Sequence, residues 1–326
     1  MTGHLVPDVV KPEEQPQSGG AAGASVEPTQ GGMTIRSFWP FLAITFALTW
    51  GVGALLIPFG EQIEALFGAL GPTNPVYLLL VYSPAIAAIT LVWHHYGVQG
   101  LGSFFRRLTL WRMPRSWWVF LLVAIPAAVY LAAVVAGTIG DPFPFSPWYA
   151  VLPAAALALA FGPIEEFGWR GVGLPLLQRR FTPLGAALII GFVWALWHLP
   201  AFLLGGTAQS SWSLVPFFLG VVALSVIITP MFNVTRGSIL MAALFHFQLM
   251  NPAFPDADPW DKLVFVLVAV AVVVVNRKRM LTREGAVTDV LMPASAAHGA
   301  RRRLRGGTGT AGVHGGARTG AGALPR

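Results

Sequence analysis

The sequence predicts an all-α protein that crosses a membrane about eight times, with both termini in the cytoplasm. Of its 326 residues, 55% are hydrophobic and only 11% are charged, whereas a soluble domain carries about a quarter charged residues. Long apolar segments recur along the chain, and Lys and Arg gather in alternate connections between them. We infer that a lipid bilayer surrounds the middle of this chain, because its helices could not cover a water-facing surface.

Eight apolar segments are expected to span, because a helix needs about 20 residues to cross the hydrocarbon core. They lie near residues 37–59, 75–96, 117–139, 149–169, 183–204, 214–232, 237–251 and 261–276. Residues 1–32 and 281–326 lack an apolar period and predict disordered tails, the second rich in Gly and Arg. One transmembrane domain, residues 33–280, is expected between them.

The distribution of Lys and Arg predicts the orientation, because cytoplasmic connections carry the excess of basic residues. Basic residues precede the first segment and follow the second, fourth, sixth and eighth: Arg36, Arg106, Arg107, Arg112, Arg115, Arg179, Arg180, Arg236, Arg277, Lys278, Arg279 and Arg283. The other connections hold one basic residue, Lys262, among mostly acidic ones. The pattern predicts a multi-pass protein of the plasma membrane. It also explains the net charge of +7 by topology, so we expect no nucleic-acid partner.

Some classes of site and fold are excluded or disfavoured by what the chain lacks. It has no Cys, which excludes disulfides, thiolate metal ligands and a cysteine nucleophile. No long internal repeat is visible, which counts against a transporter built from inverted repeats. Nothing in the sequence indicates an oligomeric state.

A few charged residues lie where the apolar pattern does not explain them. Of the fourteen acidic residues, only Glu165 and Glu166 fall inside an apolar segment. Arg170 follows on the same helix, His198 lies in the fifth segment and His246 in the seventh. A charge at membrane depth costs a few kcal/mol or more, so such residues usually mark a functional site.

Helix geometry predicts how these residues are arranged. Glu166 and Arg170 are four residues apart, so we expect an ion pair on one helix face. Glu165 points about 100° away from that face, which leaves its carboxylate free to act as a general base for water. The midpoint between Glu165 and His198 falls at the turn before Pro183, so the two should lie level in an antiparallel hairpin. These residues and His246 are therefore expected to converge on a hydrolytic site.

Two other roles are open for this cluster from the residues alone. Buried Glu, Arg and His side chains can join helices to one another without catalysing anything. Intramembrane carboxylates and histidines also line proton and ion paths.

The cluster resembles the motifs of the CPBP family of intramembrane proteases, also called the Abi family, which includes the type II CAAX prenyl endopeptidases. The family motif EExxxR matches Glu165, Glu166 and Arg170. The motif FxxxH is matched by Trp194 and His198, with Trp in place of Phe. The resemblance covers a motif core of residues 149–252.

The family's last motif is matched only in part. It is a His followed four residues later by Asn or Asp, and this chain has His246 but Met at position 250. Asn251 comes one residue later, which rotates its amide by about 100° on a regular helix.

The resemblance implies an endopeptidase that hydrolyses a membrane-associated peptide or protein at a site reached from the cytoplasmic side. Glu165 would activate a water molecule. His198 and His246, with Asn251, would polarise the carbonyl and hold the oxyanion. Alternatively Glu165, His198 and His246 would ligate zinc or another divalent metal. The sequence has no HExxH motif, and both the metal-dependent and the metal-free mechanism stay open.

Two functions other than proteolysis are compatible with the same cluster of residues. The first is a non-catalytic membrane protein for immunity or scaffolding, which the shift of Asn251 would suit. The second is a proton-coupled transporter, which the small number of Ser, Thr and Asn residues in the other spans disfavours. The identity of the substrate, and whether it is prenylated, does not follow from the sequence.

Overall fold

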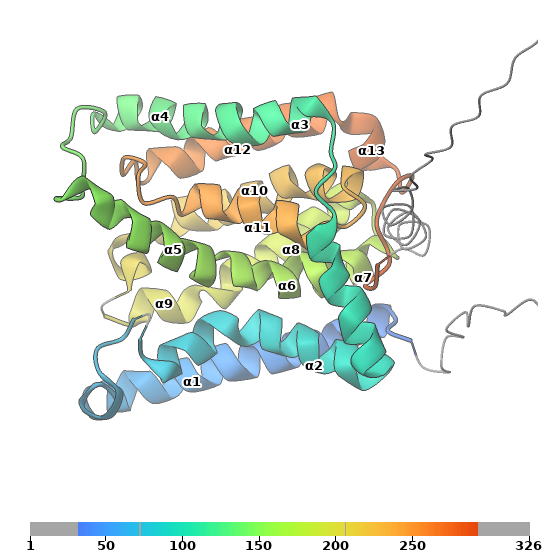
Figure 1. Ribbon diagram of the computed structural model, residues 1–326, viewed down its shortest axis with the longest axis horizontal. Helices are drawn as coiled ribbons and strands as arrows, with labels where there is room; N and C mark the ends of the chain where they lie inside the picture. The colour runs from blue at the N-terminus through green and yellow to red at the C-terminus, as the bar shows by residue number, and fades with distance from the viewer. Residues whose placement is uncertain (1–31, 72, 206, 293–326) are drawn as a thin grey trace, which may run out of the picture. The chain divides into compact units, whose positions relative to one another are not determined.

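A computed structural model describes residues 32–71, 73–205 and 207–292. Within these ranges the regular structure is entirely helical (Figure 1), which confirms the predicted all-α class. Of the tails predicted at 1–32 and 281–326, residues 1–31 and 293–326 lie outside the described residues.

The helices follow the predicted apolar segments closely. Each of the eight predicted segments contains one principal helix: α1 (Phe38–Phe67), α2 (Pro75–Phe105), α4 (Ile125–Ala136), α5 (Val151–Phe161), α8 (Pro183–Trp197), α10 (Leu214–Val234), α11 (Ile239–Leu249) and α12 (Trp260–Val275). Shorter pieces extend or join them: α3 (Arg115–Val119), α6 (Glu166–Gly168), α7 (Leu174–Gln178), α9 (Leu199–Leu203) and α13 (Arg277–Leu281). The hairpin turn lies where it was predicted, because Thr182 caps α8 by accepting from Gly185 N at 3.3 Å and Pro183 begins the helix.

Six helical segments of the described chain are long and apolar enough to cross a membrane. They are Ile35–Phe67, Pro75–Thr109, Arg115–Ala136, Trp148–Gln178, Pro183–Leu203 and Leu214–Val234. Helix α11 is apolar but shorter, and α12 has 16 residues. The count of eight and the cytoplasmic location of the termini stay predictions.

The helices pack as a membrane bundle with an apolar exterior. Helix α10 packs against α8 and α12, α1 packs against α2, and α4 lies on α12 (Figure 1). At the α8–α10 crossing a Cβ on Gly191 would lie only 2.8 Å from Ser225 Cβ, so a small residue is required there. Leu267 and Val275 of α12 are 71% and 80% exposed, as expected of side chains that face hydrocarbon.

The chain after α13 packs back onto the bundle. We expected a disordered tail over 281–326, but the described part, residues 282–292, is held by defined contacts. Val290 is 1% exposed, and Gln178 Nε2 donates to Val287 O at 2.9 Å. The prediction was wrong for these residues because their apolar side chains find buried positions that no helical period reveals.

A buried guanidinium fastens this segment to the bundle. Arg107 is fully buried and lies just after α2. Its Nη1 donates to Gly171 O and to Val290 O, both at 2.7 Å, and its Nε donates to Gly237 O at 2.8 Å. One side chain therefore joins three segments that are distant in sequence, with the Phe232 ring 5.4 Å from its Cζ.

We expect Arg107→Met to lower the stability of the protein by roughly 2–4 kcal/mol, because it leaves buried carbonyl acceptors without donors. The measurement is the midpoint of thermal unfolding in a mild detergent. The matched control is Arg106→Met, because Arg106 is the exposed neighbour and its loss should change the midpoint little. Equal midpoints for the two variants would contradict this role of Arg107.

Candidate active site

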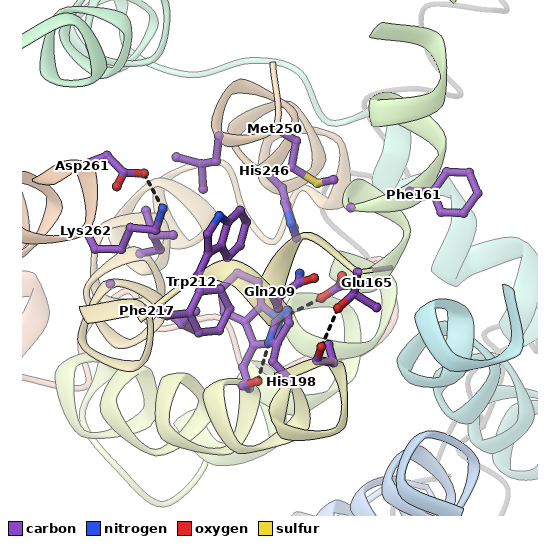
Figure 2. Close-up of a pocket in the computed structure, with 18 of the residues that line it drawn as sticks. Phe161, Glu165, His198, Gln209, Trp212, Phe217, His246, Met250, Asp261 and Lys262 are labelled. Atoms are coloured by element: carbon purple, nitrogen blue, oxygen red, sulfur yellow. Dashed lines mark hydrogen bonds and ion pairs between the residues drawn. The ribbon is translucent and has the colours of Figure 1, made fainter. Parts of the chain in front are cut away.

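A cavity of about 440 Å³ lies inside the bundle and contains the acid–base residues predicted from the sequence. Glu165, His198 and His246 line it, as Figure 2 shows, and Asn251 lines it as well. Glu166 and Arg170 do not line the cavity but are fully buried behind it. The structure thus brings together residues from three helical segments far apart in the sequence.

The helix that carries the two carboxylates is irregular at this point. A 3-10 turn over Pro163–Glu165 leads into α6, which is followed by a π-helical turn over Trp169–Gly173. Such π-turns often occur at functional sites. A Cβ on Gly168 would lie 2.5 Å from Pro84 Cβ and from Pro84 O, so glycine lets this turn lie directly against α2.

Glu166 is the anion of a buried three-residue cluster. Its Oε1 accepts from Arg170 Nη1 at 3.0 Å, which confirms the predicted ion pair. The same oxygen lies 2.8 Å from His246 Nδ1 on α11. This second contact was not predicted, because i,i+4 spacing identifies partners within a helix and not across helices.

Glu165 faces the cavity and has a different partner. Its Oε2 accepts a hydrogen bond from Trp194 Nε1 at 2.8 Å, and the residue is 5% exposed. The predicted divergence of the two adjacent carboxylates is therefore present: Glu166 binds Arg170 and His246, and Glu165 is turned to the cavity.

His198 lies opposite on the wall formed at the end of α8. Its Nδ1 is 2.9 Å from Trp194 O. Because a carbonyl oxygen only accepts, Nδ1 carries the proton, and Nε2 is an acceptor in the neutral ring. Trp197 and Phe217 pack edge-on against the imidazole, with ring centroids 4.6 and 5.1 Å away.

His246 projects its other nitrogen toward the helix that carries the carboxylates. Since Nδ1 points to Glu166, Nε2 is left for a ligand. A Cβ built on Gly162 would lie 2.9 Å from His246 Nε2 and 1.9 Å from Met250 Sδ. Glycine at residue 162 therefore lets Met250 Sδ and His246 Nε2 lie directly against this helix.

Asn251 lies on the cavity wall, but its amide is engaged with neighbouring residues. Its Oδ1 accepts from Ala253 N at 3.1 Å, and its Nδ2 lies 3.5 Å from Gln248 Oε1. Gln248 in turn donates to Leu121 O at 3.2 Å. The catalytic role predicted for Asn251 therefore stays a prediction.

The predicted metal ligands meet only part of what a metal centre requires. Both histidines use Nδ1 for a protein contact and leave Nε2, which is how metal-binding histidines are usually oriented. Nevertheless, the described part of the chain contains no group of three or more His, Cys, Asp or Glu residues placed to hold one ion. The set of Glu165, His198 and His246 does not fit a three-ligand metal centre in this arrangement.

Several residues of the site were missed by the sequence analysis. Trp194 was treated as an aromatic replacement, although its N–H makes it a donor. Gln209, Trp212 and Lys262 also line the cavity (Figure 2). Lys262 lies 2.8 Å from Asp261 Oδ2 and 4.6 Å from the Trp212 ring. The sequence could have identified Lys262 as a candidate site residue, because it is the one basic residue in the connections that otherwise carry acidic residues.

The chain is similar to known proteins over the segments that form this site. Residues 144–250, which include Glu165, His198 and His246, match the family model "Type II CAAX prenyl endopeptidase Rce1-like". The chain is also 30% identical over 185 residues to CAAX prenyl protease 2 of Methanococcus maripaludis, which covers 51% of this chain and 68% of that protein. Several apolar helices together with this match make the chain a multi-pass membrane protein. It belongs to the Rce1-like family of type II CAAX prenyl endopeptidases.

Proposed function

We propose that this protein is an intramembrane endopeptidase that hydrolyses a peptide bond in a membrane-associated peptide or protein. The observation that carries the proposal is the Glu165 carboxylate, which faces a cavity of about 440 Å³ shared with two imidazoles. A carboxylate held by one hydrogen bond from Trp194 keeps lone pairs available for a water molecule. Such a group in a largely apolar site is suited to general-base catalysis.

The charges of the cluster suggest different roles for the two histidines. Glu165, Glu166 and Arg170 carry a net charge of −1 when all are ionised, and a protonated His246 brings the sum to zero. The Glu166 carboxylate at 2.8 Å from Nδ1 stabilises that imidazolium. His246 Nε2–H would then donate to the oxyanion that forms on the scissile carbonyl.

His198 is paired with a neutral carbonyl and surrounded by aromatic rings, which favours its uncharged form. Its Nε2 would accept a hydrogen bond from the attacking water and orient it. Glu165 would take a proton from that water, and the hydroxide would attack the carbonyl carbon. When the C–N bond breaks, Glu165 would return the proton to the departing amine, which restores the carboxylate.

The wall of the cavity suggests a substrate with a large apolar group. Aromatic side chains contribute much of it: Phe161, Trp212, Phe217, Phe254 and Phe265. The relative from Methanococcus maripaludis is named a CAAX prenyl protease, and we propose a prenylated C-terminal peptide as the first substrate to test. The plasma membrane and access from the cytoplasmic side are part of this proposal.

Glu165→Gln is expected to lower kcat by at least about 10³-fold, because the amide cannot accept the proton of water. The assay is cleavage of prenylated and unprenylated peptides by purified protein in nanodiscs, with unfolding midpoints as the check on structure. The control is Glu61→Gln, since Glu61 is exposed at the end of α1. A cellular effect of the protein that survives Glu165→Gln would favour the non-catalytic immunity or scaffold role instead.

Glu166→Gln is expected to destabilise the protein by about 3–5 kcal/mol, because it leaves the buried Arg170 guanidinium without an anion. Unfolding midpoints measure this loss, with the exposed Asp141→Asn as control. The double variant Glu166→Gln/Arg170→Met should recover part of the stability but not the activity, since His246 still lacks its anion. Recovery of both would show that the cluster serves stability alone.

Removal of divalent metals is expected to leave cleavage within about twofold of its original rate, because the three predicted ligands do not form a metal-binding group. Dialysis against a chelator followed by metal analysis and the peptide assay tests this expectation. Activity that is lost on chelation and returns with Zn²⁺ would contradict it and would support Glu165, His198 and His246 as ligands.

A further inference from the structure

The indole of Trp194 contacts Glu165, the guanidinium of Arg170 and both histidines of the site. Its Nε1 donates to Glu165 Oε2 at 2.8 Å. The Arg170 Cζ lies 4.5 Å from the indole ring. The imidazoles of His246 and His198 lie 5.4 and 5.9 Å from it between ring centroids. The side chain is 4% exposed, so these contacts are shielded from water.

We infer that Trp194 is a positioning residue for Glu165, fixing its carboxylate in the orientation in which it receives the proton of water. This inference rests on the proposed function. A carboxylate on a flexible side chain has several rotamers, and one charge-assisted hydrogen bond of normal length selects among them. Because the bond occupies Oε2, the proton of the water would go to Oε1.

The replacement of Phe by Trp at this motif position therefore changes the chemistry of the site. Phe and Trp fill similar apolar space, but only the indole has an N–H donor. Phe at residue 194 would leave Glu165 Oε2 without the donor that it has here. The donor that orients the Glu165 carboxylate is thus supplied by α8 and not by the helix that carries Glu165.

The indole also covers the cation behind the site. Arg170 is fully buried, and its Nε and Nη2 have no hydrogen-bond partner among the described residues. The face of the Trp194 ring attracts the guanidinium by its quadrupole. The same ring therefore separates the Glu166–Arg170 pair from the cavity and directs its N–H edge to Glu165.

One property of Trp194 makes the inference testable with little ambiguity. Its hydrogen bond with His198 runs through the backbone carbonyl, which any residue at position 194 supplies. A change of the side chain therefore removes the bond to Glu165 and leaves the contact with His198 Nδ1.

The kinetic test compares Trp194→Phe with Trp117→Phe in the peptide-cleavage assay. Trp117 is also buried, 9% exposed, but it packs in α3 against Phe120. We expect Trp194→Phe to lower kcat about 10- to 100-fold, the range for a hydrogen bond to a charged group, with KM within about twofold. Trp117→Phe should leave both constants unchanged. A 3-benzothienylalanine at residue 194, which replaces the N–H by sulfur in the same shape, should reproduce the loss.

A second measurement does not depend on activity. In protein labelled with ¹⁵N-Trp, the indole signal of Trp194 should move on Glu165→Gln, because its acceptor loses the negative charge. The signal of Trp197, which donates to Thr49 Oγ1 at 2.6 Å, should stay in place. The Trp194 signal is assigned by its absence from the benzothienyl or Phe variant.

The outcomes separate this inference from the proposed function. Full activity of the benzothienyl variant would overturn the inference, and so would a Trp194 indole signal that does not move on Glu165→Gln. In either case, loss of cleavage in Glu165→Gln would still support the proposed function. A rise in KM without a fall in kcat would also overturn it, because the indole would then serve substrate binding. A wild type that cleaves no peptide would overturn both.

Discussion

The arrangement of this protein depends on one buried carboxylate. Glu166 is completely buried, and an ionised carboxylate in such surroundings is stable only with charged or hydrogen-bonding partners. Arg170 supplies one partner from the same helix and His246 supplies the other from α11. Helix α11 must therefore lie at the depth and rotation that bring His246 Nδ1 to Glu166, and this placement also brings His246 Nε2 against Gly162.

The different environments of the two adjacent carboxylates, Glu165 and Glu166, follow from the same constraint. Because Glu166 is turned toward Arg170, the preceding side chain, Glu165, is turned away from it and reaches the cavity. The irregular helix around these residues allows the turn to lie against α2 without losing the ion pair. Trp194 then separates the two environments, with its ring on the Arg170 guanidinium and its N–H on the Glu165 carboxylate.

The sequence was sufficient for the parts of this site that depend on one helix or one turn. The intrahelical pair of Glu166 and Arg170 follows from spacing, and the hairpin at Pro183 follows from its turn chemistry. Contacts between helices could not be predicted, because they depend on the rotation and approach of each pair. The bond from Trp194 to Glu165 and the contact between Glu166 and His246 belong to this group. The amide of Asn251 could not be placed from the sequence either, because its position depends on how α11 ends.

The end of the folded domain, predicted at residue 280, also depends on contacts that the sequence pattern does not reveal. Apolar periodicity ends with α13, yet Val290 is buried and its carbonyl accepts from Arg107. The same guanidinium binds Gly171 O in the π-helical turn after Glu166 and Gly237 O just before α11. These two segments carry Arg170 and His246, the partners of the buried carboxylate. The chain beyond the last helix is therefore coupled to the cluster of Glu166, Arg170 and His246 through one buried cation, so the unit that builds the candidate site extends at least to this segment.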